Sequence, residues 1–249
     1  VAARDGDNLR LEIPPQESQI TVLATAEREL IDRLAQPVSV ITASEIDRIQ
    51  GPNFTRILER LPGATFIRNG GLGGFTGLSV RGGSADQLLV LIDGVRVADA
   101  AAPAGGFDFG GVMAGAVGKV ELLRGPNSVV WGADAMAGVI SITTRNPPDL
   151  LARVEAGTDR SFDAVLGTRY ASGPVELDLI GSLHSGEGFS AAEGGSENDG
   201  FRQWQLAGKA RIELARGLKL SGNARHAEGQ VEIDGFPAPD YVLADTDEE

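Results

Sequence analysis

The feature that most constrains the fold of this chain is an alternation of apolar and polar residues that begins at Leu150 and continues to Ala227. Successive side chains of a β-strand point to opposite faces, so the alternation predicts strands with one apolar and one polar face. The predicted strands are residues 150–157, 162–170, 175–184, 201–214 and 218–227. The connections at 171–174 and 215–217 are short, whereas residues 185–200 and the tail after 227 are long and acidic. Short and long connections in alternation favour a transmembrane β-barrel, although a soluble antiparallel sandwich also alternates.

Residues 37–148 have the pattern of a compact α/β segment. Residues 88–92 are apolar at every position, which predicts a strand covered on both faces, and Asp93-Gly94 predicts a hairpin turn after it. Further strands are predicted at 38–42, 78–81, 95–97, 117–123 and 138–144. Short helices are predicted at 45–49, capped by Ser44, and at 54–61, capped by Asn53. A glycine-dense loop occupies residues 69–77.

Composition and missing motifs exclude several functions. The formal net charge is −13, and this excess of acidic groups argues against nucleic-acid binding. The chain has no cysteine, which excludes thiolate metal sites and a cysteine nucleophile. It also lacks a nucleophile elbow and a phosphate loop, and the glycine cluster at 70–77 does not match a dinucleotide fingerprint. We therefore expect no enzymatic activity.

Residues 1–36 form a polar, irregular N-terminal segment that contains one apolar patch rich in β-branched residues. The patch consists of Ile20, Thr21, Val22, Leu23, Ala24, Thr25 and Ala26. Such a segment suits strand addition to the sheet edge of a partner. An ordinary edge strand of the following domain explains the patch equally well.

Six motifs in order make the middle segment resemble the plug of TonB-dependent outer-membrane receptors. They are Pro37–Thr42, Leu58–Gly63, Ser79–Gly82, Leu89–Arg96, Val120–Pro126 and Ser128–Ile140. Within that family the chain is most similar to the vitamin B12 (cobalamin) transporter branch, although Trp131 stands where that branch has a tyrosine. Residues 196–201 also resemble that branch.

The resemblance implies an α+β plug domain at 37–148 followed by antiparallel transmembrane β-barrel strands at 149–249. It implies a bacterial outer-membrane receptor that imports a scarce nutrient, cobalamin above all, without enzymatic chemistry. The patch at 20–26 would be the TonB box, lying in the periplasm and pulled by TonB and its inner-membrane energising complex. The outward barrel face would contact outer-membrane lipid. A ferric-siderophore receptor and a soluble plug-like ligand-binding module are the alternatives.

The family barrel has roughly 22 strands, and the strands predicted here are too few to close around a plug. We therefore expect the chain to be the amino-terminal part of a longer receptor, either excised, truncated or split. It begins with Val1 and no apolar leader follows, so we expect either a signal peptide already removed or an excised piece.

The resemblance implies that the glycine-rich plug loops, residues 69–77 and 98–111, bind the ligand. These loops also suit energy-coupled transport, because they can move without disturbing a packed core. The predicted residues are Asn69, Gly70, Gly71, Leu72, Gly73, Phe75, Ala100 and Phe107. Charges at Arg81, Asp93 and Arg124 are expected to pair either with the barrel wall or within the plug.

The resemblance also suggests Ca²⁺ in the acidic outer loops, where carboxylate oxygens from adjacent loops are the ligands that Ca²⁺ prefers. The ligands that it suggests are Glu193, Glu197, Asp199 and Asp234. Acidic loops that are simply solvated are the alternative, and no other cofactor is expected.

Overall fold

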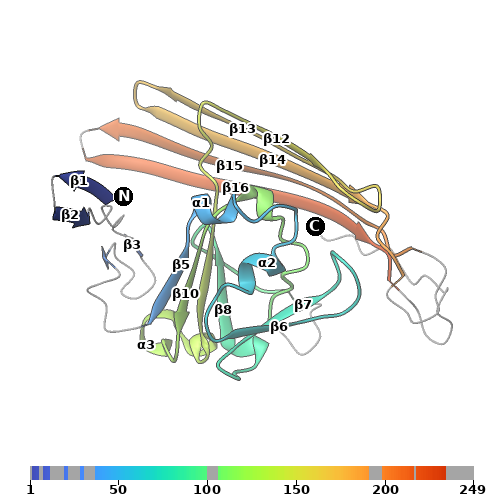
Figure 1. Cartoon of the computed structure of the whole chain (residues 1–249). Coiled ribbons are helices and arrows are strands. Elements are labelled where there is room, and N and C mark those ends of the chain that lie inside the picture. Colours follow the sequence, from blue (N-terminus) through green and yellow to red (C-terminus); the bar gives the residue numbers. More distant parts are fainter. Residues whose placement is uncertain are drawn as a thin grey trace.

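A mixed sheet that stands end-on against a long antiparallel sheet makes up most of the molecule (Figure 1). The structure is a computed structural model. It describes residues 2–5, 8–11, 20–21, 29–30, 37–99, 106–190, 198–215 and 217–233.

The mixed sheet is five-stranded, in the order β5-β10-β11-β8-β9. Its strands are β5 (Val38–Ile41), β8 (Leu88–Ile92), β9 (Val95–Val97), β10 (Val117–Arg124) and β11 (Gly138–Thr144). Strands β8 and β11 pair in parallel, and the other pairs are antiparallel. Every residue of β8 is buried, with Val90 in the larger hydrophobic cluster on one face and Leu89 in a second cluster on the other. The strand covered on both faces is therefore confirmed.

Short helices and a small hairpin surround this sheet. The helices are α1 (Ala43–Ile46), α2 (Thr55–Leu58), α3 (Ser128–Trp131), η2 (Ala85–Gln87), η3 (Ala114–Ala116) and η4 (Ala133–Ala135). In the described parts of the chain, no helix is long and apolar enough to cross a membrane. The hairpin pairs β6 (Ala64–Arg68) with β7 (Thr76–Val80), and β6 was not among the predicted strands.

The helix caps differ in part from the prediction. Ser44 was expected to cap the first helix, but α1 starts one residue earlier and Thr42 is its N-cap. The Thr42 backbone N–H donates to Glu45 Oε2 at 2.8 Å, which is half of a capping box that Ser44 cannot form. Asn53 does act near α2, since its Oδ1 accepts from the Thr55 backbone N–H at 2.9 Å.

The antiparallel sheet has the order β12-β13-β14-β15-β16 and contains all the strands predicted from the alternation. Its strands are β12 (Leu150–Ala156), β13 (Phe162–Ser172), β14 (Val175–Gly186), β15 (Phe201–Ala215) and β16 (Leu218–Val231). Leucines expected on the outward face are exposed, including Leu179 at 51% and Leu220 at 59%. We call this sheet the wall, and its inward face covers the end of the mixed sheet.

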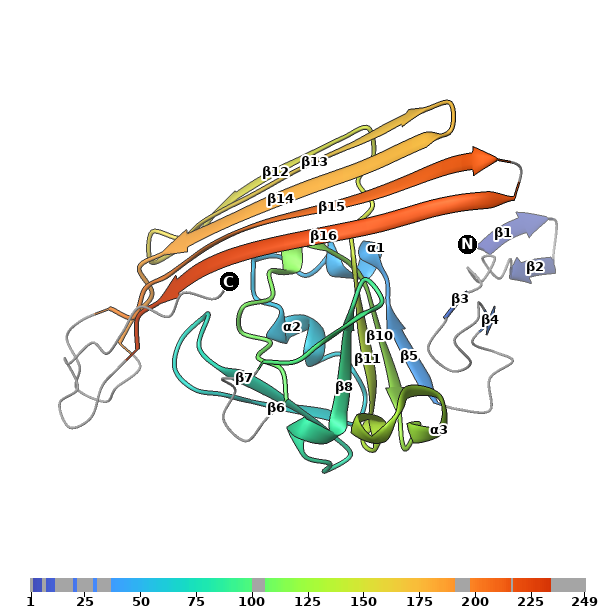
Figure 2. The same ribbon diagram turned by 180° about the vertical axis from the view of Figure 1, so that it is seen from behind.

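The N-terminal segment contributes two further small sheets. They pair β1 (Ala2–Asp5) with β2 (Asn8–Leu11), and β3 (Ile20–Thr21) with β4 (Glu29–Leu30). Figure 2 shows β1 and β2 at the end of the wall where β13 turns into β14 and β15 into β16. The β6–β7 hairpin extends toward the opposite end, where β14 connects to β15.

Candidate functional site

The loop between β6 and β7, residues 69–75, is the predicted ligand-binding loop nearest the outer connections, and backbone hydrogen bonds hold its shape. The Asn69 N–H donates to the Phe75 carbonyl at 3.0 Å, and the Gly74 N–H donates to the Gly71 carbonyl at 3.4 Å. Gly70 and Gly73 have φ of 79° and 84°, a region that favours glycine. Asn69 and Gly70 are exposed, whereas the other predicted residues of the loop, Gly71, Leu72, Gly73 and Phe75, are half-buried.

Asp108 joins this hairpin to the second predicted plug loop. Its Oδ1 accepts from the backbone N–H groups of Thr76 at 2.6 Å and Gly110 at 2.8 Å. Burial raises the pKa of Asp108, and the nearby charge of Asp99 raises it further, while the two N–H donors act in the opposite direction. The two loops therefore meet at a carboxylate that the motif analysis did not select.

The second loop is described only in part. Phe107 packs edge-on against Phe109, with ring centroids 5.0 Å apart, and both rings contact the core. Ala100 lies outside the described residues.

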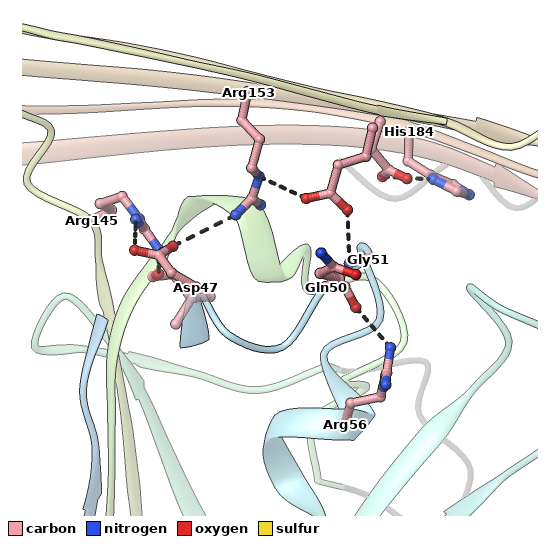
Figure 3. A network of polar contacts seen from close by, with 10 residues as sticks. Asp47, Gln50, Gly51, Arg56, Arg145, Arg153 and His184 are labelled. Carbon is pink, nitrogen blue, oxygen red and sulfur yellow. Dashed lines mark hydrogen bonds and ion pairs between the residues drawn. The ribbon is translucent and has the colours of Figure 1, made fainter. Parts of the chain in front are cut away.

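An ion-pair network attaches the plug to β12 of the wall (Figure 3). Asp47, directly after α1, binds Arg145 at 2.7 Å and faces Arg153 of β12 at 3.6 Å. Arg153 pairs with Glu155 at 3.2 Å, and Glu155 accepts from the Gly51 backbone N–H at 3.0 Å. Sequence reasoning missed this network, because nothing in the pattern indicates that α1 lies beside β12.

A second attachment joins β8 to β15. Asp93 Oδ1 lies 2.8 Å from Lys209 Nζ, and the two side chains are only 8% and 13% exposed. Lys209 also donates to the Thr144 carbonyl at 2.7 Å. Of the two pairings expected for Asp93, the one with the wall is therefore the one observed.

Of the other two plug charges, Arg124 bonds to carbonyls within the plug, whereas the bond found for Arg81 involves its backbone and not its charge. Arg124 donates to the carbonyls of Pro37 at 3.4 Å and Pro62 at 2.9 Å. The Arg81 backbone N–H donates to the Gly63 carbonyl at 2.8 Å.

Apolar and amide contacts complete the junction between plug and wall. Ala116 of η3 is buried in a cluster with Val165, Ile180 and Ala207 of the wall. Farther along β15, Gln203 Nε2 donates to the Gly111 carbonyl at 2.6 Å.

Of the four suggested Ca²⁺ ligands, only Asp199 lies in the described residues, and it is buried. Glu193, Glu197 and Asp234 lie outside them. The described ranges contain no group of three or more His, Cys, Asp or Glu residues that could hold a metal ion. Nearby acidic groups are compensated, since Glu187 pairs with Arg160 at 2.6 Å and Glu232 accepts from the Gly200 backbone N–H at 2.9 Å.

The predicted TonB box is described only at its start. Ile20 and Thr21 form β3, which pairs with Leu30 and Glu29 of β4. Val22, Leu23, Ala24, Thr25 and Ala26 lie outside the described residues.

Comparison with known proteins identifies relatives of this chain. Residues 31–139 match the family model of the TonB-dependent Receptor Plug Domain. The chain is 31% identical over 233 residues to the vitamin B12 transporter BtuB of Photobacterium profundum, covering 90% of this chain and 38% of that protein. The chain thus spans well under half the length of this relative.

Solved receptors share the fold. The pyoverdine receptor FpvA of Pseudomonas aeruginosa matches with a TM-score of 0.69 and 16% identity, over 86% of this chain and 28% of that chain. The ferric enterobactin receptor PfeA of the same species matches with a TM-score of 0.60 and 21% identity, over 78% of this chain and 33% of that chain. The six plug motifs, the mixed sheet against an antiparallel wall and these matches agree: the chain belongs to the TonB-dependent receptors, a family of outer-membrane receptors rather than enzymes, and it comprises a plug domain and part of a β-barrel.

Proposed function

We propose that the protein is an outer-membrane receptor that imports cobalamin, with energy supplied by TonB from the inner membrane. The observation that carries this proposal is the 31% identity to a vitamin B12 transporter, which extends over 90% of the chain and therefore over both plug and wall.

The arrangement of loops supports an orientation with the N-terminal segment in the periplasm. Transmembrane barrels have short turns on the periplasmic side and longer loops outside. The short turns of the wall lie at the end where β1 and β2 are found, and the long β14–β15 connection lies at the other end (Figure 2). A ligand arriving from outside would meet the β6–β7 loop first.

The contacts between plug and wall suit energy-coupled import. Strand addition of TonB to residues 20–26 would transmit a pull to the plug through backbone hydrogen bonds. The Asp93–Lys209 pair and the Asp47 network would hold the plug in register with the wall until that force acts. The exposed leucines of the outward face would contact lipid.

Ca²⁺ is proposed to order the outer connections, with ligands Glu193, Glu197, Asp199 and Asp234. Calorimetry tests this, with a binding heat expected for the wild type and its loss after Asp199→Ala with Asp234→Ala. Equal heats for the two proteins, or none at millimolar Ca²⁺, leave solvated acidic loops as the explanation.

A ferric siderophore is the alternative ligand. The solved receptors named above bind pyoverdine and enterobactin, but at 16% and 21% identity they support the fold alone. A soluble ligand-binding module is the alternative of another class.

Equilibrium titration of the receptor purified from outer membranes, with cyanocobalamin against ferric enterobactin and ferric pyoverdine, distinguishes these ligands. We expect saturable binding of cyanocobalamin only. Saturation by a ferric siderophore alone would transfer the proposal to that ligand. A protein that stays monodisperse in buffer without detergent would favour the soluble module.

A further inference from the structure

Loop 69–75 of the plug contacts the wall at the aromatic ring of Phe201. We propose that Phe201 of β15 is a positioning residue for loop 69–75, which sets the ligand affinity of the plug from the wall without itself touching the ligand. The statement about affinity rests on the proposed function, whereas the packing contact does not.

The contact between Phe201 and Gly73 leaves no space for a side chain. A Cβ built on Gly73 would overlap Cδ2 and Cε2 of the Phe201 ring. Phe201 is 7% exposed, and the cavity lined by Phe201, Gly73 and Gln203 measures about 10 Å³, which leaves room for no more than about one water molecule. The ring and the loop backbone are therefore in close contact, and a side chain at position 73 would displace one of them.

The ring is held from behind by the wall. The imidazole of His184 lies against it, with ring centroids 5.3 Å apart, and His184 is itself 3% exposed. His184 Nδ1 contacts Asp163 Oδ1 at 2.9 Å, which orients the imidazole from the next strand. The chain of contacts thus runs from β13 through β14 and β15 to the plug.

Phe201 lies where the outer β14–β15 connection enters the wall. Phe201 is the first residue of β15 and directly follows the β14–β15 connection. Two residues later, on the same face, Gln203 holds the second loop through the Gly111 carbonyl. A ligand or ion that shifts the outer connection would therefore move the ring on which the plug loop rests.

Two glycines of the loop provide a matched test. Gly70 and Gly73 have φ of 79° and 84°, so alanine is strained to a similar degree at either position. Gly70 has nothing within 4 Å of its would-be Cβ, whereas Gly73 has the Phe201 ring. The difference between Gly73→Ala and Gly70→Ala thus isolates the contact with Phe201.

Hydrogen exchange on the receptor purified from outer membranes measures the loop directly, through the amides of Asn69 and Gly74. We expect these amides to exchange about tenfold faster or more in Gly73→Ala than in Gly70→Ala, as for overpacking of a close contact. In the Phe201→Ala background the overlap is absent, so adding Gly73→Ala there should accelerate exchange no more than Gly70→Ala does in the wild type. Equal rates in the two single glycine variants, or the same large acceleration by Gly73→Ala in both backgrounds, would overturn the contact.

Cyanocobalamin titration of the same variants tests the effect on affinity. Phe201→Ala should weaken binding by about tenfold, as for loss of preorganisation of a binding loop, and Phe201→Leu should weaken it less. Unchanged affinity in Phe201→Ala with accelerated exchange would refute the positioning role. If the wild type binds no cyanocobalamin, the proposed ligand is wrong, and the same titration with ferric enterobactin and ferric pyoverdine then decides the positioning role.

Discussion

Asp93 shows how a single residue of the plug depends on the wall. Asp93 lies in the turn between β8 and β9 and has a φ of 49°, in the left-handed region. From this turn its carboxylate meets Lys209 of the wall. Both side chains are nearly buried, so the carboxylate relies on its cation and on hydrogen bonds from Thr144.

Lys209→Met tests this dependence, because it leaves the Asp93 carboxylate buried without its cation. We expect the free energy of unfolding in detergent to fall by about 3–5 kcal/mol, as for other broken buried ion pairs. Lys219→Met on exposed β16 is the control, with an expected change within about 0.5 kcal/mol. Adding Asp93→Asn to Lys209→Met should recover part of the loss; no recovery would mean that charge burial is not the cause.

Asp108 gives a prediction about pH, because burial raises its pKa above the ordinary value of 3.8. A carboxyl with a raised pKa in the folded state stabilises the protein below its unfolded pKa, and this stability is lost as pH rises through the folded pKa. Asp108→Asn, which keeps an acceptor for both N–H groups, should remove this gain at low pH. Unfolding followed from about pH 3.5 to pH 7 measures it. A gain at low pH identical in wild type and variant would assign it to another carboxyl.

At the scale of elements, the sequence pattern predicted the strand where its apolar residues either alternate or run without interruption. All the wall strands and the apolar strand β8 lie where their patterns predicted them. Strand β6 was missed because Phe66 packs on the core while its neighbour Ile67 is 71% exposed, so no simple alternation marks it. Its pairing with β7 is what makes it a strand.

The predicted TonB box is an element that acts through its backbone. Leu23→Pro should leave ligand binding unchanged and abolish uptake, because proline removes a donor that strand pairing needs. Leu23→Ala is the matched control and should reduce uptake far less. Uptake by whole cells and binding to isolated membranes measure the two effects separately. Undiminished uptake by the proline variant would refute the assignment of residues 20–26 as the TonB box.

At the scale of the whole molecule, the outward face of the wall distinguishes a membrane protein from a soluble one. Leu179→Arg should lower the free energy of unfolding in lipid vesicles by about 2–4 kcal/mol, because the charge would face lipid. Ser221→Arg is the control. Ser221 pairs across the ladder with Arg211 and so lies on the opposite, polar face of the sheet, where the added charge should have a far smaller effect. On a water-exposed face both changes would stay within about 0.5 kcal/mol.

The sequence by itself determined the local structure and the family. The period of two defined the wall strands and their apolar face, since neighbouring side chains of a strand point in opposite directions. The uniformly apolar 88–92 defined the covered strand, and six motifs indicated the plug. Only the tertiary structure decided which plug residues meet the wall. Asp47 and Arg153, Asp93 and Lys209, and Gly73 and Phe201 are each separated by about a hundred residues or more, and a local pattern carries no information about such distant pairs. These contacts exist because the plug stands end-on against the wall, an arrangement set by packing rather than by the pattern of any one segment.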